Sequence, residues 1–362
     1  MLEVINVSSN IIRKAAIKKI LLCFICYCSI CLSANAQNFD LKNYDVTVDG
    51  STLENAFAGG FDAPQLSEID FNLDGQMDLL VFDRKGNVAR PFVHDGVPGS
   101  TNYTYEPKYQ IGLPPLKGFV RVADYNQDGV PDLFTAPEFT VAGVAVFTGS
   151  WDGERLRFSR YRVGNFDFDI LTVTANGAPT NLYVFEGDVP ALVDMDKDGD
   201  LDILSFEVGG SFVTYFRNMA LDKGLGLDTF DFVLEDLCWG KFKEGGFDGT
   251  IFLSDNPNQC ADGFAPEIEF EERHAGSTIE VFDYQCDGDY DLLVGDLLGR
   301  NITLLINEPD NGRDFVQDTI VRFPENDPID IHIFPNTWVI DCLLYTSPSP
   351  RDQRGSRMPS SA

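Results

Sequence analysis

Short apolar runs alternate with polar, glycine-containing turns along most of the chain. Four of these runs are Leu79–Phe82, Leu133–Phe134, Ile203–Leu204 and Leu292–Val294. Each run is too short for a helix and is bounded by Gly and Asp, which is typical of buried β-strands. The pattern therefore predicts an all-β fold.

An acidic segment of nine residues precedes each of these runs. Its first, third, fifth and ninth positions carry oxygen-bearing side chains, and its sixth position is Gly. The four copies begin at Asp70, Asp124, Asp194 and Asp283 and superpose without gaps. Ordinary Asp and Gly turns would explain one or two copies but not four with the same spacing. We name these segments loops 1 to 4 and number positions from the first Asp.

The residue types of the loops point to calcium. Ca²⁺ is a hard cation that takes about six to eight oxygen ligands, and Gly at position 6 permits the sharp turn that brings the position 7 carbonyl to the ion. An EF-hand would also need a Glu at position 12 and flanking helices. Position 12 is instead Val81, Thr135, Ser205 or Val294. We therefore expect calcium sites between strands.

These repeats resemble the FG-GAP and VCBS repeat family of calcium-loop β-propellers, which includes integrin α-subunit head domains and many secreted bacterial proteins. The first Asp residues of the loops lie 54, 70 and 89 residues apart, a period suited to a four-stranded blade. The segment from Phe61 to Asn87 is especially similar to propellers of Bacteroidota-type bacteria. The resemblance covers about residues 56–341 and implies a propeller of about seven blades, truncated here to four blades and the start of a fifth.

The resemblance also implies one calcium ion per loop, held by the side chains at positions 1, 3, 5 and 9 and the carbonyl at position 7. The implied ligands are Asp70, Asn72, Asp74, Gln76 and Asp78 in loop 1; Asp124, Asn126, Asp128, Val130 and Asp132 in loop 2; Asp194, Asp196, Asp198, Asp200 and Asp202 in loop 3; and Asp283, Gln285, Asp287, Asp289 and Asp291 in loop 4. Gln285 departs from the usual Asp or Asn. Loop 3, with four carboxylates, is expected to bind tightest.

The 89-residue interval contains more chain than a blade needs, and we assign the excess to an insertion at about residues 235–269. Export favours oxidation, so Cys238 and Cys260 are expected to form a disulfide worth about 3 kcal/mol. Cys286, at position 4 of loop 4, is a free thiol or an alternative partner.

The N-terminus has the features of a secretory signal peptide. Basic residues are followed by an apolar run from Ile20 to Leu32 and by the small-x-small triplet Ala34–Ala36. The apolar run is shorter than the roughly 20 residues of a membrane span. We therefore expect a signal peptide at residues 1–36, a lead-in at 37–55, no transmembrane span, and a secreted or cell-surface protein.

The C-terminus loses the acidic, strand-like texture of the preceding chain. Residues 342–362 resemble translated sequencing-adapter sequence and are expected to be foreign to the protein. The apolar approach to Asp341 matches the lead-in of the other loops. We therefore expect Asp341 to begin a fifth loop and the natural gene to continue beyond it.

The acidic composition restricts the possible partners. The chain has 57 Asp and Glu residues against 27 Lys and Arg, a formal charge of -30 and a pI near 4.2. This charge disfavours nucleic acid and anionic lipid. Acid–base chemistry has only His94, His274 and His332 to draw on. The chain contains no nucleophile elbow, phosphate loop or zinc motif.

A few aromatic and acidic residues are candidate carbohydrate contacts. Trp151 and Trp239 are suited to stacking on sugars, but a Trp beside a turn more often packs over a strand edge. Trp338 is expected in the core. Glycosidases place two carboxyls across a cleft, whereas the acidic residues of 266–272 are neighbours on one segment and are expected on a solvated strand face. These residues are Glu267, Glu269, Glu271 and Glu272.

Two main functions agree with these observations. The first is an exported, calcium-binding propeller that binds protein or glycan partners without catalysis. The second is a propeller-fold carbohydrate-active enzyme, a polysaccharide lyase or hydrolase, with His94, His274 or a Tyr as candidate base. A purely structural role is a third. The lack of catalytic motifs favours the first, so we expect no enzymatic activity.

Overall fold

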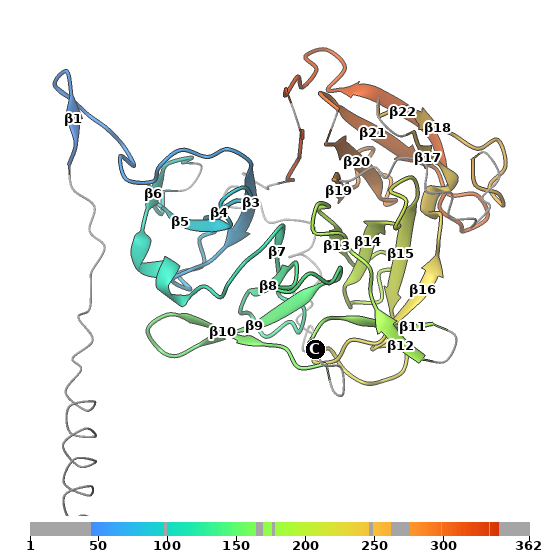
Figure 1. Ribbon diagram of the computed structural model, residues 1–362, viewed down its shortest axis with the longest axis horizontal. Coiled ribbons are helices and arrows are strands. Elements are labelled where there is room, and N and C mark those ends of the chain that lie inside the picture. Colours follow the sequence, from blue (N-terminus) through green and yellow to red (C-terminus); the bar gives the residue numbers. More distant parts are fainter. Residues whose placement is uncertain are drawn as a thin grey trace, which may run out of the picture. The chain divides into compact units, whose positions relative to one another are not determined.

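The computed structural model (Figure 1) describes residues 45–97, 100–163, 169–175, 178–245, 249–261, 276–297, 299–332 and 334–339. All of them belong to one compact unit. The expected signal peptide, the adapter-like tail, Asp341, His274 and the acidic residues of 266–272 lie outside the described residues. No helix within the described part of the chain is long and apolar enough to cross a membrane.

The fold is all-β, with four blades arranged as a β-propeller. Each blade contains four sequential strands that are neighbours in one sheet and pair antiparallel. The strands are β3 (Pro64–Ile69), β4 (Asp78–Asp83), β5 (Val88–His94) and β6 (Tyr103–Tyr105) in blade 1, β7 (Val120–Ala123), β8 (Asp132–Thr135), β9 (Ala145–Trp151) and β10 (Leu156–Arg160) in blade 2, β13 (Ala191–Val193), β14 (Asp202–Phe206), β15 (Val213–Asn218) and β16 (Phe232–Asp236) in blade 3, and β19 (Ser277–Phe282), β20 (Asp291–Asp296), β21 (Ile302–Asn307) and β22 (Val316–Phe323) in blade 4.

The apolar runs of the sequence form the second strand of each blade, which confirms their prediction as buried strands. Every residue of β8, β14 and β20 is buried. A second strand has sheet neighbours on both edges and packed side chains on both faces, so its sequence is a continuous apolar run. The outermost strand β22 is exposed at half of its positions.

The first strands of the four blades are innermost. β3, β7, β13 and β19 together line a cavity of about 190 Å³. Arg121 of β7 reaches Glu280 of β19 with 2.6 Å between Nη1 and Oε2, and also donates to the carbonyls of Pro190 and Ile279. A charged side chain from one blade therefore ties its inner strand to inner strands elsewhere in the propeller.

Apolar side chains fill the spaces between successive blades. One cluster joins blades 1 and 2 through Leu80 and Leu133, another joins blades 2 and 3 through Phe134 and Ile203, and a third joins blades 3 and 4 through Leu204, Leu292 and other residues. The blades are thus held together mainly by burial of the faces that they turn toward each other.

Blade 3 corrects the expectation of uniform four-stranded blades, because its sheet has six strands. The hairpin β11 (Thr172–Ala175) and β12 (Ala178–Asn181) comes from the segment between blades 2 and 3. β11 pairs in parallel with β16, at Val173 and Phe232, and so covers the outer edge of the blade. The 70-residue interval before loop 3 is therefore used partly to extend the sheet.

The segment after β16 has its own small structures. It contains the 3₁₀ turn η2 (Trp239–Lys241) and the two-stranded sheet of β17 (Lys243–Glu244) and β18 (Ile251–Phe252). Cys238 and Cys260 form the predicted disulfide around these elements. Strand β16 ends at Asp236, next to the start of this segment. Two further elements precede blade 2: the hairpin of β1 (Thr47–Val48) and β2 (Ser51–Thr52), and the 3₁₀ turn η1 (Pro107–Gly112).

A buried glutamine connects blades 1 and 2. Gln65 of β3 is 2% exposed. Its Nε2 donates to the carbonyl of Gly118 at 3.0 Å, and its Oε1 accepts the N–H of Val120 at 2.8 Å. The side-chain amide thus satisfies a buried carbonyl just before β7 and the N–H of the first residue of β7.

Replacement of this amide should loosen the contact between the blades. We expect Gln65→Leu to lower the free energy of unfolding by about 2–3 kcal/mol, because two buried backbone groups lose their partners. The measurement is urea unfolding of the full chain. Gln317→Leu is the matched control, since exposed Gln317 donates to a single carbonyl and should change stability by less than about 0.5 kcal/mol. Equal midpoints for the two variants would contradict this role of Gln65.

Candidate functional site

Loops 1 to 4 occupy the same topological position in all four blades. Each joins the first strand to the second, and position 9 is the first residue of the second strand. Position 6 has a positive φ of 84°, 85°, 108° and 98° in Gly75, Gly129, Gly199 and Gly288, a conformation that favours glycine. The predicted connection between two strands of one blade is confirmed.

Position 4 also has a left-handed backbone in every loop, although none of its residues is Gly. The φ angles are 54°, 57°, 63° and 59° for Leu73, Gln127, Lys197 and Cys286. A left-handed Leu or Lys is unusual, and such residues are held in place by the structure around them.

Backbone N–H groups inside each loop point at the carboxylates. The Gly N–H at position 6 donates to Oδ2 of position 1 at 2.8–3.1 Å in all four loops. The N–H of position 7 donates to Oδ1 of position 5 at 2.8–3.0 Å. These bonds fold the loop back on itself, so the ligand-type oxygens of positions 1 and 5 are held by the same short backbone segment.

The aspartate at position 9 fastens the loop to the rest of the blade. Asp78, Asp132, Asp202 and Asp291 are at most 1% exposed. In each, Oδ2 accepts the N–H of position 2 at 2.9–3.1 Å. Oδ1 accepts an N–H from the third strand at 2.7–2.9 Å. One carboxylate therefore joins the loop, the second strand and the third strand. Sequence reasoning assigned position 9 a ligand role only and missed this bridge.

Burial changes the acid–base behaviour of these aspartates. Desolvation raises the pKa of Asp78 to about 6 and of Asp132 and Asp202 to about 7, against the lowering effect of the backbone hydrogen bonds. Nearby aspartates of the same loops add to the increase. A raised folded-state pKa means that the stability these groups contribute is greatest below about pH 4 and is lost as pH rises through about 6 to 7. Near neutral pH the loops therefore carry a cost of unneutralised negative charge.

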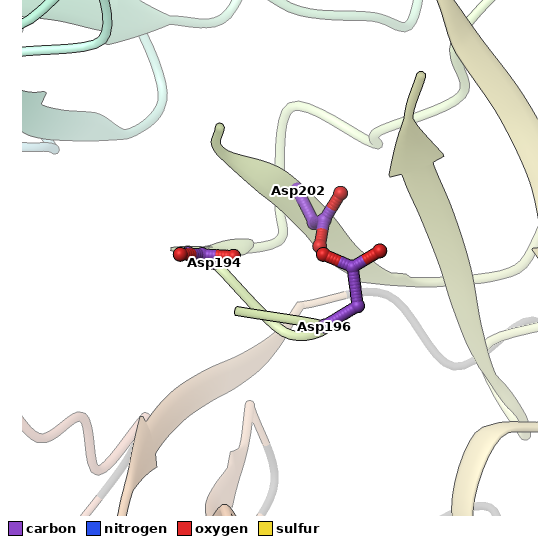
Figure 2. Close-up of side chains that lie close together, drawn as sticks. All are labelled: Asp194, Asp196 and Asp202. Atoms are coloured by element: carbon purple, nitrogen blue, oxygen red, sulfur yellow. The ribbon is translucent and has the colours of Figure 1, made fainter. Parts of the chain in front are cut away.

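Loop 3 brings its carboxylates closest together. Oxygens of Asp194, Asp196 and Asp202 lie within 4.8 Å of one another. Figure 2 shows Asp194 and Asp196 on the loop and Asp202 at the start of β14. Asp194 Oδ1 is buried without a hydrogen-bond partner among the described residues, as is Oδ1 of Asp200 at position 7. These orphaned oxygens fit a site for a hard cation.

Asp200, at position 7 of loop 3, is a buried carboxylate. Its side chain is 2% exposed, and its Oδ2 accepts the N–H of Leu221 at 3.0 Å. Burial, and then repulsion from Asp198, Asp196 and Asp194, raises its pKa to about 6. Asp200 is thus a fifth carboxylate of loop 3 and increases the local negative charge.

Two residues outside loop 3 belong to its surroundings and were not found by sequence reasoning. Asp222, after β15, has a carboxylate within 4.8 Å of those of Asp196 and Asp198. Arg217 lies between these acids, with Nε 2.5 Å from Asp196 Oδ2 and Nη2 2.8 Å from Asp222 Oδ2. The arginine offsets part of the negative charge. Neither residue belongs to the repeat, so only the folded chain reveals their proximity.

Loop 4 differs from the others at position 3. Gln285 Nε2 donates to Glu308 Oε1, just beyond β21, at 3.3 Å. In loops 1 to 3 the position 3 side chain instead accepts the N–H of position 5 at 3.0–3.3 Å. The longer side chain of Gln285 therefore reaches out of the loop, whereas the Asp or Asn usual at position 3 stays within it.

The tryptophans occupy three different environments. Trp239 is 1% exposed and its Nε1 donates to Asp314 Oδ2 at 2.8 Å. Trp151 is half-buried against the cluster between blades 1 and 2. These two confirm the packing interpretation. Trp338 corrects the expectation of a core residue, because it is half-buried beside the central cavity and its Nε1 has no partner among the described residues.

The remaining candidates include a histidine and a cysteine. His94 is 6% exposed; its Nδ1 accepts the N–H of Gly96 at 3.1 Å, and its Nε2 lies 3.1 Å from the carbonyl of Ser100. Both ring nitrogens thus hold the turn after β5. Cys286 is a free, exposed thiol, which resolves the alternatives for this residue.

Comparison with known proteins identifies no family. No family model matches the chain, and no curated protein matches it. One similar solved structure is a lectin from Agrocybe aegerita described as recognising non-reducing terminal N-acetylglucosamine. It is 16% identical, with a TM-score of 0.34, over 75% of this chain and 71% of the lectin chain. This similarity assigns neither a ligand nor an activity to the protein.

If the aspartate at position 9 bridges the loop and the third strand, its removal should destabilise the protein even without metal, unlike removal of a residue that is only a metal ligand. We expect Asp132→Ala to lower the free energy of unfolding by about 3 kcal/mol in metal-free buffer, because the N–H groups of Tyr125 and Gly149 lose their buried acceptor. Asn126→Ala, at position 3 of the same loop, should cost about 1 kcal/mol or less under the same conditions. Chemical unfolding of both variants provides the measurement. Similar losses for the two would argue against the bridge.

Proposed function

We propose that this protein is an exported, calcium-binding β-propeller that acts as a non-enzymatic scaffold for protein or glycan partners outside the cell. The observation that carries the proposal is the fourfold repetition of one loop geometry between the first and second strands of successive blades. Ordinary turns have no reason to keep oxygen side chains at four fixed positions and a left-handed Gly at a fifth.

The oxygens of each loop fit a hard divalent cation. The side chains at ligand positions 1, 3, 5 and 9 are all carboxylates or amides. Loop 3 also has two buried carboxylate oxygens without hydrogen-bond partners among the described residues. The side chains of positions 1, 3, 5 and 9 and the carbonyl of position 7 would hold the ion. Calcium would supply positive charge where the aspartates repel one another, so its binding free energy would contribute to folding rather than to a reaction.

The proposed role in binding depends on this rigidity. A propeller whose loops are neutralised by calcium keeps its blades in fixed relation, and loops on a rigid framework are where proteins commonly bind partners. His94 is engaged by Gly96 and Ser100, and the described residues present no specific observation in favour of the enzyme alternative. Export is inferred from the N-terminal sequence pattern.

Calcium should raise the thermal stability of the protein. We expect the melting temperature of the full chain to rise by about 5 °C or more between chelator and millimolar calcium, because the ion binds the folded state preferentially. Asp198→Ala should remove one equivalent of bound calcium and reduce this increase. Glu154→Ala, an equal loss of charge in the exposed β9–β10 turn, should retain the full increase. A melting temperature that is the same with calcium and with chelator would contradict the proposal.

The absence of catalysis can be tested separately from calcium binding. We expect the calcium-loaded chain to retain a glycan or an extracellular protein from immobilised panels and to release no product from it. Asp198→Ala should retain less of the same partner because one loop is loosened. New reducing ends or unsaturated sugar products from a polysaccharide panel would instead support the lyase or hydrolase alternative.

A further inference from the structure

Two of the loops reach the next loop through the side chain at position 4. Gln127 of loop 2 donates from Nε2 to the carbonyl of Gly199 in loop 3 at 2.8 Å. Lys197 of loop 3 donates from Nζ to the carbonyl of Gly288 in loop 4. Both donors occupy position 4 and both acceptors occupy position 6, so the same contact is made twice between successive blades.

The accepting carbonyl belongs to the peptide unit that holds a ligand carboxylate. The peptide between Gly199 and Asp200 accepts from Gln127 at its oxygen, while its N–H donates to Asp198 Oδ1 at 3.0 Å. In loop 4 the equivalent N–H, that of Asp289, donates to Asp287 Oδ1 at 3.0 Å. Hydrogen bonds on the two sides of one peptide unit strengthen each other. The neighbouring loop therefore acts on the orientation of the position 5 carboxylate.

The donor residue is equally well placed to respond to its own loop. Position 4 lies between two ligand positions, and its left-handed backbone, φ 57° in Gln127 and 63° in Lys197, is set by the fold of that loop. An ion held by positions 3 and 5 would restrict the residue between them and so the direction of its side chain. Binding of the ion in the donor's own loop would then already have ordered that side chain. The ion that binds the next loop would not have to supply this entropy cost again.

Loop 1 provides a natural contrast. Its position 4 residue is Leu73, which is 37% exposed and has no side-chain donor. It cannot form the hydrogen bond that Gln127 and Lys197 form.

We propose that loops 2, 3 and 4 bind calcium cooperatively, with the position 4 side chain of one loop transmitting occupancy to the next, and that loop 1 binds independently. This inference rests on the proposed calcium-binding function and adds a mode of regulation to it. Coupling of this kind is reciprocal, so an ion in loop 3 also favours an ion in loop 2.

The test is a calcium titration of the full chain by calorimetry with a competing chelator. Asp198→Ala identifies the binding constant that belongs to loop 3. We expect Gln127→Leu to retain every site and to weaken binding at loop 3 about fivefold, as for the loss of one hydrogen bond. Asp128→Ala should remove the loop 2 site and weaken loop 3 by a similar factor. The variant that combines Gln127→Leu and Asp128→Ala should bind calcium at loop 3 no more weakly than either single variant, because both changes interrupt the same connection.

Leu73→Ala is the matched control at position 4 of loop 1, and it should leave the constants of loops 2 to 4 unchanged. Lys197→Met extends the test to loop 4. Removing the ammonium should by itself favour a cation there, so weaker calcium binding at loop 4 would support transmission through the hydrogen bond.

The outcomes separate the coupling from calcium binding itself. Two results would overturn the coupling and leave calcium binding itself intact. One is a calcium-binding constant of loop 3 in Gln127→Leu that lies within twofold of the wild-type value. The other is an additive effect of Gln127→Leu and Asp128→Ala on that constant. A wild-type chain that takes up no calcium would overturn both the coupling and the proposed function.

Discussion

A buried carboxylate at the start of each second strand is the constraint on which the blades depend. Asp78, Asp132, Asp202 and Asp291 each accept one N–H from their own loop and one from the third strand. A charge at this depth is costly, and two charge-assisted hydrogen bonds offset part of that cost. The fold therefore places an acidic group in the core of every blade and builds a polar loop around it.

This arrangement links the structure of the blades to the proposed calcium sites. The same aspartates have pKa values raised by burial, and other carboxylates gather nearby, most densely in loop 3. Arg217 offsets some of this negative charge through ion pairs with Asp196 and Asp222. A divalent cation bound there would offset more, and its binding free energy would then stabilise the fold.

Local features of the fold could be predicted from the sequence, whereas features that depend on distant segments could not. The loops and the strands after them follow from spacing within a short segment, and Cys238 and Cys260 lie close in the chain. The β11–β12 hairpin beside Phe232, the place of Trp338 at the central cavity and the approach of Asp222 to loop 3 depend on how separate segments pack. The bridging role of position 9 could not be predicted because an Asp in the sequence can be either a metal ligand or a hydrogen-bond acceptor.

The central claim is that these loops hold calcium through the oxygens that the fold brings together. The most direct measurement is a crystal structure of the calcium-loaded chain with an anomalous difference map. The account predicts a peak in loop 3 at about 2.3–2.6 Å from its ligand oxygens, with equivalent peaks in the other loops. The ligands in loop 3 are the carboxylates of Asp194, Asp196, Asp198 and Asp202 and the carbonyl of Asp200. Loops without a peak at saturating calcium, or ions bound elsewhere while the loops keep this geometry, would contradict it.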